Sequence, residues 1–287
     1  MKVQIDVVQA EAGLLAEGPL WDEATETLYW VDIPAGTVHA LDTAGARRSW
    51  DVAADVGCIV LRRDGGAVVA LRHGLHALDL TTGAVTFLAD AERDDVTTRY
   101  NDGKCDPSGR LWVGTLDDED RPTAALYRLD ADHSMHEVRS GVRCSNGLGW
   151  SPDGGTLYWT DSPTRKILAF DYDADTGEAR RPRELVGDER GLPDGLAVDA
   201  EGCIWSARWD GDCVVRYAPD GRVLTTLPLP VSRPTSVAFG GAGLDHLYIT
   251  SAAWKLTPPE RERQPLAGAL FVCRPGVQGM PAARFAG

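Results

Sequence analysis

The chain has 287 residues, and 43 acidic against 29 basic side chains give it a formal net charge of −14. This charge disfavours a nucleic-acid partner and an anionic membrane surface, because both require a basic face. No stretch reaches the roughly 20 apolar residues of a membrane span, and the opening MKVQIDVVQAEAG lacks the continuous apolar core of a signal peptide. We therefore expect a soluble cytoplasmic protein, as a monomer or a weak homo-oligomer.

Six segments of the chain repeat one pattern, a short apolar run, a turn and a second apolar run. EGPLWDEATETLYWVD is the first copy and NGLGWSPDGGTLYWTD is the fourth. The spacing between successive copies is 40 to 48 residues. Five copies carry a glycine eight positions after their first residue, where a turn with positive φ is expected: Gly65, Gly109, Gly154, Gly202 and Gly243.

A third apolar run follows each copy, and a fourth, less regular run follows most of them. VHALD from Val38 and LYRLD from Leu126 are examples of the third run, and AVTFLAD from Ala84 is an example of the fourth. Six units of four short strands predict an all-β fold, a six-bladed β-propeller formed by residues 1–287 as a single domain. The sixth unit ends after its third strand, so the alternating run Val3 to Val8 is expected to supply the missing strand and close the ring.

Polar residues recur at the start of the first strand in these units. The first strand of every blade lines the channel of a propeller, so these residues converge on the axis: Glu17, Gly57, Asn101, Asn146, Asp194 and Thr235. Four of the six carry carboxylate or amide oxygens, which suit a hard divalent cation. The alternative is that each side chain bonds to the backbone at a strand end. The shared phase favours a cation, because clustered carboxylates alone would repel one another.

Other reactive patterns are absent or weak. No G-x-S-x-G motif is present, and all six histidines lie outside the ring positions, which disfavours a nucleophile-elbow hydrolase and a histidine-ligated zinc site. Most of the nine tryptophans fit core packing, with Trp209 near a strand end as an exception. The six cysteines form no C-x-x-C pair and are expected to be buried free thiols, with a Cys203–Cys213 disulfide as the alternative.

Four motifs together resemble the family of gluconolactonase, regucalcin (senescence marker protein) and luciferin-regenerating enzyme. They are EGPLW at Glu17, RYNDGKCDPSGRLWVGT at Arg99, SNGLGWSPDG at Ser145 and PDGLAVDAEGCIW at Pro193. The match continues to QPLAGALF at Gln264, so the resemblance covers nearly the whole chain. It implies a six-bladed propeller with one divalent cation on the axis, Ca²⁺ first, with Mg²⁺, Mn²⁺, Zn²⁺ or Fe²⁺ as alternatives.

Carried over motif by motif, the resemblance implies that Glu17, Asn146 and Asp194 are the metal ligands. It also implies that Arg99 and Asn101 of the R-x-N-D-G motif contact the substrate.

The resemblance further implies that a Glu shortly after the G-T that ends the second strand of the same blade contacts the substrate in some family members. The segment here is GTLDDED, so Glu119 is the first candidate, and Asp117, Asp118 and Asp120 compete with it. The loop between Asp117 and Ala125 looks shorter than in some relatives, which affects lid contacts and substrate size.

These residues predict a metal-dependent hydrolase that opens a sugar lactone, such as gluconolactone or a pentonolactone, to the aldonic acid. Asp194 is the candidate general base, although coordination would lower its basicity. The first alternative is an esterase or phosphotriesterase-like hydrolase on the same scaffold. The second is a calcium-binding propeller without catalysis. Acidic side chains in the channel next to Arg99 favour chemistry over the second alternative.

Overall fold

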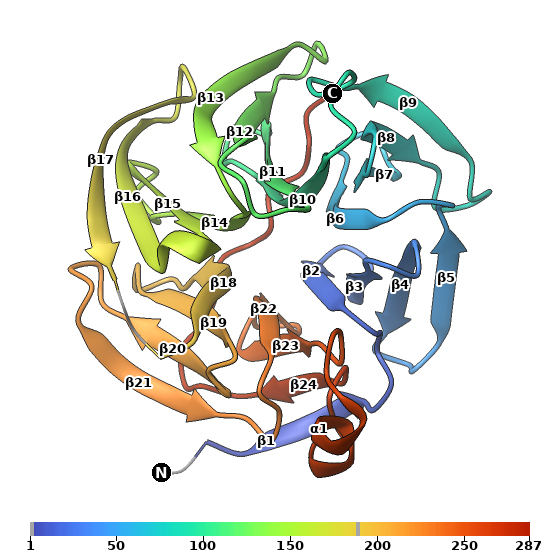
Figure 1. The fold of residues 1–287 in the computed structure, drawn as a ribbon, viewed down its shortest axis with the longest axis vertical. Coiled ribbons are helices and arrows are strands. Elements are labelled where there is room, and N and C mark those ends of the chain that lie inside the picture. Colours follow the sequence, from blue (N-terminus) through green and yellow to red (C-terminus); the bar gives the residue numbers. More distant parts are fainter. Residues whose placement is uncertain (1–2, 188–189) are drawn as a thin grey trace.

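The computed structural model describes residues 3–187 and 190–287, and it shows a ring of six sheets around a central axis (Figure 1). Each sheet has four antiparallel strands, so the predicted six-bladed β-propeller is confirmed. Blades 1 to 3 consist of β2 (Ala16–Asp22), β3 (Thr27–Asp32), β4 (Thr37–Asp42), β5 (Arg47–Asp51), β6 (Val56–Leu61), β7 (Ala67–Leu71), β8 (Gly74–Leu78), β9 (Val85–Ala89), β10 (Thr98–Cys105), β11 (Leu111–Asp117), β12 (Ala124–Leu129) and β13 (Met135–Val142).

The remaining blades follow the same inner-to-outer order. They consist of β14 (Ser145–Trp150), β15 (Thr156–Asp161), β16 (Lys166–Asp173), β17 (Glu178–Val186), β18 (Leu192–Val198), β19 (Ile204–Trp209), β20 (Cys213–Tyr217), β21 (Val223–Pro228), β22 (Pro234–Gly240), β23 (His246–Ser251), β24 (Leu270–Cys273) and β1 (Ile5–Gln9). Two short helices, η1 (Ser162–Thr164) and α1 (Pro258–Arg263), lie in the connections.

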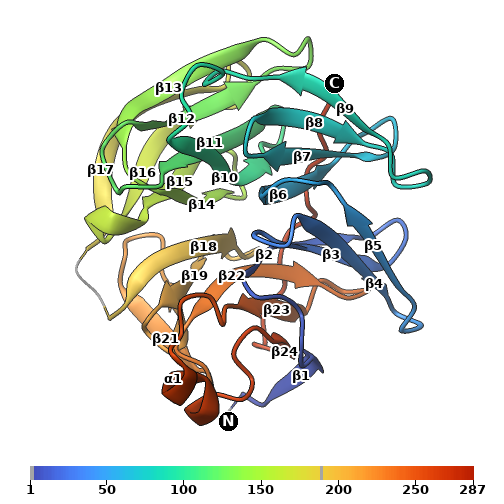
Figure 2. The ribbon, with the colours of Figure 1, turned by 45° about the vertical axis from the view of Figure 1, so that its right-hand side comes forward.

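The N-terminal strand closes the ring as predicted. β1 pairs antiparallel with β24, with Ile5 opposite Cys273 and Val7 opposite Phe271. Blade 6 therefore combines the N-terminal strand with three strands from late in the chain, and Figures 1 and 2 show β1 at the outer edge of β24. This pairing fixes the first and last blades side by side, so the circle of sheets has no open break there.

The turn between the first two strands of a blade uses a left-handed residue in most units. Gly65, Gly109, Gly154 and Gly202 have positive φ as predicted, because an L-side chain would be strained there. The prediction for Gly243 is wrong. The longer turn of blade 6 places Gly241 and Leu244 in the left-handed region instead.

The hydrophobic core lies between neighbouring blades. Each junction has its own buried cluster in the described chain, as between blades 2 and 3, where Tyr100, Leu111 and Leu129 pack together. All six cysteines are free and five of them are buried, which confirms the expectation of free thiols.

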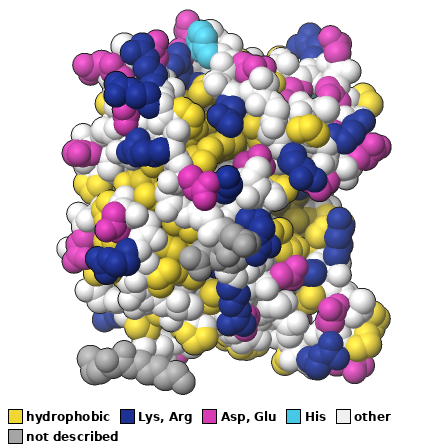
Figure 3. All heavy atoms as spheres, turned by 60° about the vertical axis from the view of Figure 1, so that its left-hand side comes forward, with side chains coloured by type: hydrophobic (Ala, Val, Ile, Leu, Met, Phe, Trp, Pro, Cys, Tyr) yellow, Lys and Arg dark blue, Asp and Glu magenta, His cyan; other side chains and the backbone are white. Residues whose placement is uncertain are grey.

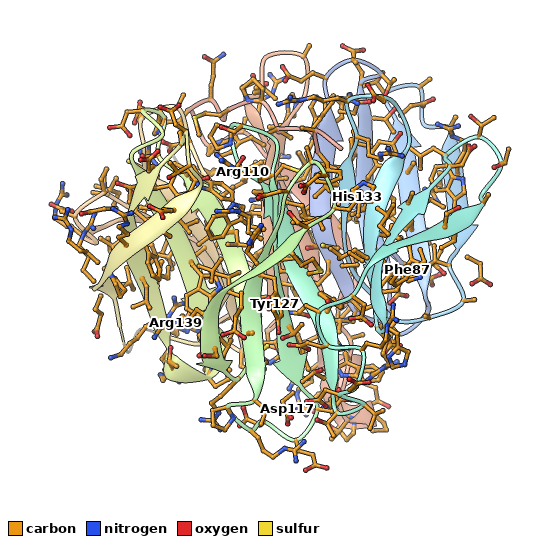
Figure 4. The ribbon with its side chains drawn as sticks, turned by 90° about the horizontal axis from the view of Figure 1, so that it is seen from above. Phe87, Arg110, Asp117, Tyr127, His133 and Arg139 are labelled. Atoms are coloured by element: carbon orange, nitrogen blue, oxygen red, sulfur yellow. The ribbon has the colours of Figure 1, made fainter. Side chains whose placement is uncertain are left out.

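The C-terminal strap, defined as residues 277–287, runs from blade 6 back across the ring (Figure 1, red). The repeat pattern predicts no element here. The Phe285 amide donates to the Leu61 carbonyl at 2.8 Å, and the Ala286 amide donates to the Gly109 carbonyl at 2.9 Å. The Phe285 side chain is fully buried in the core cluster of blades 2 and 3 and stacks on His133. Figure 4 shows His133 and Arg110 at one end of blade 3 and Asp117 at the other.

On the face shown in Figure 3, acidic and basic side chains are scattered with apolar atoms between them. Among the described residues, no helix has the length and apolar character needed to cross a membrane.

Candidate active site

The polar ring positions sit at irregularities in the innermost strands. The pairing register of each inner strand with its neighbour shifts at or next to the ring position, as between Glu17 and Leu20 and between Asn146 and Leu148. A β-bulge breaks the alternation of side chains and re-aims them. The bulges therefore explain how residues that are unfavourable in strands face the axis.

These residues line one pocket of about 520 Å³, here called the upper pocket. Glu17, Arg99, Asn101, Asn146 and Asp194 all contribute to its wall, although they come from four different blades. The structure thus brings together every predicted site residue except Glu119. Trp209, which the sequence singled out among the tryptophans, also lines the pocket, together with Trp254.

Two buried carboxyl groups dominate the electrostatics of the floor. Glu17 and Asp194 are each 6% exposed. Burial, and then the charges of Asp194 and Asp102, raise the pKa of Glu17 well above its usual range. Burial, and then the charge of Asp102, raise the pKa of Asp194 in the same way. Two carboxylates cannot both be ionised here without a compensating positive charge.

The Asn146 amide is held in one orientation. Its Nδ2 donates to the Ser162 hydroxyl at 2.8 Å, and that hydroxyl donates to the Pro193 carbonyl at 2.6 Å. Its Oδ1 accepts a hydrogen bond from Asn101 Nδ2 at 3.1 Å and keeps a second lone pair. Both polar atoms of the Asn146 side chain form hydrogen bonds at this strand end, which explains why an amide stands at this position.

Asn101 connects the arginine to this amide. Its Oδ1 accepts from Arg99 at 3.0 Å, and its Nδ2 also donates to the Ser145 carbonyl at 2.8 Å. Arg99 further donates to the Tyr100 carbonyl, and burial lowers its pKa. Both polar atoms of the Asn101 amide therefore bind protein partners. Arg99 forms no bond to a carboxylate among the described residues.

The acidic loop after β11 separates the four competing carboxylates. Glu119 does not line the upper pocket: its side chain is 68% exposed and pairs with Arg121 at 3.5 Å. Asp117 lies inside the loop and accepts hydrogen bonds from the Glu119 and Arg121 amides at 2.8 and 3.1 Å.

Asp117, Asp118 and Asp120 all line the pocket, but the Asp117 side chain is fully buried and its carboxylate is occupied by Arg121 and Thr123. Asp118 pairs with Arg72 at 2.9 Å, and Asp120 pairs with Arg143. A substrate contact from this loop therefore fits Asp118 or Asp120 better than Glu119.

Two ring positions have structural uses. A Cβ on Gly57 would lie 2.5 Å from the Asn101 carbonyl oxygen, so glycine lets β6 and β10 approach. The Thr235 hydroxyl donates to the Ala16 carbonyl at 2.6 Å and ties blade 6 to blade 1. Thr235 therefore fits the alternative of a side chain bonded to the backbone, whereas Gly57 allows two strands to approach closely.

Sequence reasoning missed Ser162, Asp102 and Lys104. Ser162 follows the second strand of blade 4, where a serine is unremarkable in sequence. Asp102 stands next to Asn101 in the ring phase, which is the signal that could have identified it. Burial raises the pKa of Asp102, and the positive charge of the half-buried Lys104 opposes this shift. The Lys104 amine donates to the Leu196 carbonyl at 2.7 Å.

The donor set at the floor of the upper pocket fits a divalent cation. Among the described residues no group of three or more His, Cys, Asp and Glu side chains is arranged to hold a metal, so an ion would rest on two carboxylates and an amide. Asp194 Oδ1 is buried and has no hydrogen-bond partner in the described chain. An orphaned oxygen beside a second buried carboxyl fits a hard cation.

Comparison with known proteins gives the family. The model for the SMP-30/Gluconolactonase/LRE-like region matches residues 15–253. The chain belongs to this family. It is 39% identical to 6-deoxy-6-sulfogluconolactonase from Pseudomonas putida, with 100% of both chains covered, and 37% identical to regucalcin from Xenopus laevis, with 99% of both covered.

A solved structure gives the same fold. The crystal structure of a calcium-binding protein, regucalcin, from Agrobacterium tumefaciens superposes with a TM-score of 0.95 at 28% identity, covering 99% of this chain and 98% of that one. The resemblance seen in the motifs is thereby confirmed along the length of the protein.

Proposed function

We propose that the protein hydrolyses a sugar lactone to the aldonic acid in the upper pocket. The observation that carries the proposal is the orphaned Asp194 Oδ1, buried beside Glu17 and next to Arg99 at the base of a polar pocket. The family membership and the lactonase among the relatives support this choice of reaction. Glu17, Asn146 and Asp194 would hold a divalent cation, with Ca²⁺ as the first candidate.

Asp194 and Arg99 have separate roles in the proposed hydrolysis. Water attacks the lactone carbonyl carbon, the bond to the ring oxygen breaks, and that oxygen leaves as a hydroxyl group. Asp194 accepts a proton from the attacking water and passes it to the departing ring oxygen, and the carboxylic acid product releases its own proton to solvent at neutral pH. Arg99 donates to substrate oxygens with the guanidinium nitrogens that its bonds to Tyr100 and Asn101 leave free. A bound cation would supply stabilisation of the negative charge that develops on the carbonyl oxygen.

The walls suit a polyhydroxylated ring. Trp209 and Trp254 offer apolar faces, and the ion-paired Asp118 and Asp120 offer acceptors for hydroxyl groups. A pocket of about 520 Å³ accommodates a compact sugar lactone.

A lactone panel tests the reaction. Each turnover consumes one water and releases one proton at neutral pH, so hydrolysis is followed by pH-stat with spontaneous opening subtracted. Hexono- and pentonolactones, a 6-sulfonated hexonolactone and an organophosphate are compared on metal-stripped protein, with each divalent ion restored in turn. Calorimetry measures ion binding separately from turnover. The proposal predicts turnover of at least one lactone, and turnover of the organophosphate alone would contradict it.

The 6-sulfonated lactone has its own reason for inclusion. Lys255 is an exposed lysine on the wall of the upper pocket and forms no ion pair among the described residues. An anionic group at the far end of a bound sugar would form an ion pair with Lys255. If Lys255 binds such a group, Lys255→Gln lowers kcat/KM for the sulfonated lactone and leaves kcat/KM for gluconolactone nearly unchanged.

A second candidate function is calcium binding without catalysis. The description of the Agrobacterium tumefaciens relative as a calcium-binding protein favours it. Tight ion binding in the calorimeter with no proton release from any lactone would select this function over the first.

A further inference from the structure

Two tryptophans on the wall of the upper pocket contact the same arginine. Trp209 is the last residue of β19 in blade 5, and Trp254 follows β23 in blade 6. Arg233 is the residue before β22, its side chain is 15% exposed, and it is not among the described residues that line the pocket. It therefore lies next to the wall but outside the space that a substrate would occupy.

The Arg233 guanidinium makes three different contacts. Its Cζ lies 4.9 Å from the centroid of the Trp209 ring, which is a cation–π distance. Its Nη1 donates to the Trp254 carbonyl at 2.5 Å, and its Nε donates to Asp210 Oδ1 at 2.6 Å. One planar group thus joins the loop after β19 to the loop after β23, which a single ammonium group could not do in the same geometry.

Both loops turn through a left-handed residue next to the tryptophan. Asp210 and Lys255 have φ values of 55° and 58°. A residue with a side chain keeps this conformation only where its surroundings determine it. Arg233 supplies part of these surroundings, because its side chain binds Asp210 and its carbonyl accepts from the Ala252 amide at 2.9 Å.

Other arginines also stack on tryptophans in this protein, but not at the pocket. Of the tryptophan rings that carry an arginine in the described chain, only Trp209 lines the upper pocket. Arg216 is the best match to Arg233: it is 14% exposed, pairs with Asp199 at 2.7 Å, and its Cζ lies 5.5 Å from the Trp205 ring. Stacking of this kind is therefore a general packing device here, and the position of Arg233 makes it different.

We propose that Arg233 is a positioning residue for the substrate, which holds Trp209 and Trp254 as a fixed apolar wall for the sugar ring of the lactone. The kinetic part of this proposal rests on lactone hydrolysis in the upper pocket. A wall that is ordered before binding loses less conformational entropy when the substrate packs against it. Trp209 is also opposite Leu192, two residues before Asp194, so the wall has a fixed register with the proposed base. Arg233 therefore acts on substrate binding and not on the chemical step.

Steady-state kinetics on the preferred lactone test the role in binding. Arg233→Gln should raise KM about tenfold and leave kcat within about twofold, because it weakens ground-state and transition-state binding alike. Arg233→Lys keeps the charge without the planar fork, so its KM should stay well above that of the parent. Arg216→Gln is the matched control: it leaves the buried Asp199 without this partner and should destabilise the fold at least as much, yet keep KM within about twofold.

A second measurement does not depend on turnover. The ¹H–¹⁵N heteronuclear NOE of the indole groups reports their motion in labelled protein, with Trp209→Phe and Trp254→Phe used for assignment. Arg233→Gln should lower the NOE of the Trp209 and Trp254 indoles and leave that of Trp205 unchanged, whereas Arg216→Gln should leave both wall indoles unchanged. If the parent hydrolyses no lactone, the proposed function fails, and this measurement still decides whether Arg233 holds the wall.

Four outcomes overturn the proposal. Unchanged indole NOE values in Arg233→Gln would show that the wall is ordered without the arginine. An equal rise of KM in Arg216→Gln would show that the effect comes from loss of stability. A fall in kcat at constant KM would place Arg233 in the chemical step, and full activity of Arg233→Lys would show that charge alone is sufficient.

Discussion

Four inner strands, β2, β10, β14 and β18, line both the upper pocket and the lower cavity, a space of about 320 Å³ in the lower half of the channel, yet the chemistry of the two differs. The first residues of these strands place Glu17, Asn146 and Asp194 around the axis, at or beside a bulge in each strand. The later residues of the same strands surround a largely apolar cavity that the strap crosses. Charge is therefore concentrated where strand pairing is irregular, and apolar packing is concentrated where pairing is regular.

This difference teaches how the fold separates function from stability. Two buried carboxyls that repel each other oppose folding unless a ligand compensates them. The burial of Phe285 at the lower side contributes stability and makes no contact with the upper pocket. The two halves should therefore respond to mutation in opposite ways.

The largest effect is expected for Asp194→Ala. Loss of the proton acceptor and of one ligand oxygen should lower kcat/KM for the preferred lactone about 10²- to 10⁴-fold and abolish ion binding. The ion-free variant should be at least as stable as the ion-free parent, because one of two repelling carboxyls is gone. Turnover, calorimetry and urea unfolding measure these three quantities.

Asp64→Ala is the matched control, since Asp64 is an exposed acid in a turn of blade 2. It changes the net charge equally and should leave turnover and ion binding as they are. Full lactonase activity in Asp194→Ala would contradict the proposed base and ligand together.

Phe285→Ala tests the lower half. Removal of a fully buried aromatic side chain should lower the free energy of unfolding by about 3 to 5 kcal/mol. Because the upper pocket is untouched, kcat/KM at a temperature where the variant is folded should change less than twofold. Val96→Ala, at a side chain that is 77% exposed, should change stability by less than about 0.5 kcal/mol. An activity loss that exceeds the loss of folded protein would show that the halves are coupled.

The sequence predicts the blades and most of the upper pocket, because both follow from the repeat. Glu17, Asn146 and Asp194 occupy the same position in the repeat. A propeller brings residues at the same repeat position together around its axis. Glu119 could not be separated from its neighbours in this way. The loop turns at Asp120, which has a φ of 60°, and this local geometry decides which acids face the pocket.

Ser162 and the strap have no periodic signal. Ser162 acts only because its turn returns to Asn146, 16 residues earlier. Phe285 is buried only because blades 2 and 3 leave a space between them.

Ser162→Ala sharpens the description of the upper pocket. The substitution leaves Asn146 Nδ2 with only the weak acceptor Cys144 Sγ, at 3.6 Å, so the orientation of the amide is less well fixed. Loss of such a supporting hydrogen bond typically lowers metal affinity 10- to 100-fold, which calorimetry with Ca²⁺ would measure. Ser206→Ala removes another fully buried hydroxyl, from blade 5 and outside the pocket, and should leave ion affinity unchanged. Equal losses of ion affinity in both variants would show that Ser162→Ala acts through general destabilisation.

The smallest effect concerns the acidic loop at the rim of the upper pocket. Hydrogen bonds from Arg121, and then from Thr123, hold the pKa of Asp117 well below its usual range. A carboxyl with a lowered folded pKa contributes stability that is present above the unfolded pKa, near 4, and is lost as pH falls through the folded pKa. Hydrogen exchange at the Glu119 and Arg121 amides should therefore be well protected at pH 6 and lose protection progressively below pH 4, after correction for intrinsic rates.

Asp117→Asn should reduce this protection at pH 6 and remove its pH dependence, while Asp64→Asn should do neither. The strap offers the contrast, because its Phe285 and Ala286 amides are held by packing and backbone carbonyls rather than by a carboxylate. Their protection should follow global stability in both variants. If the strap amides lost protection in step with the loop in Asp117→Asn, the rim would be part of the global unfolding unit, and the separation of the two halves would fail at the loop.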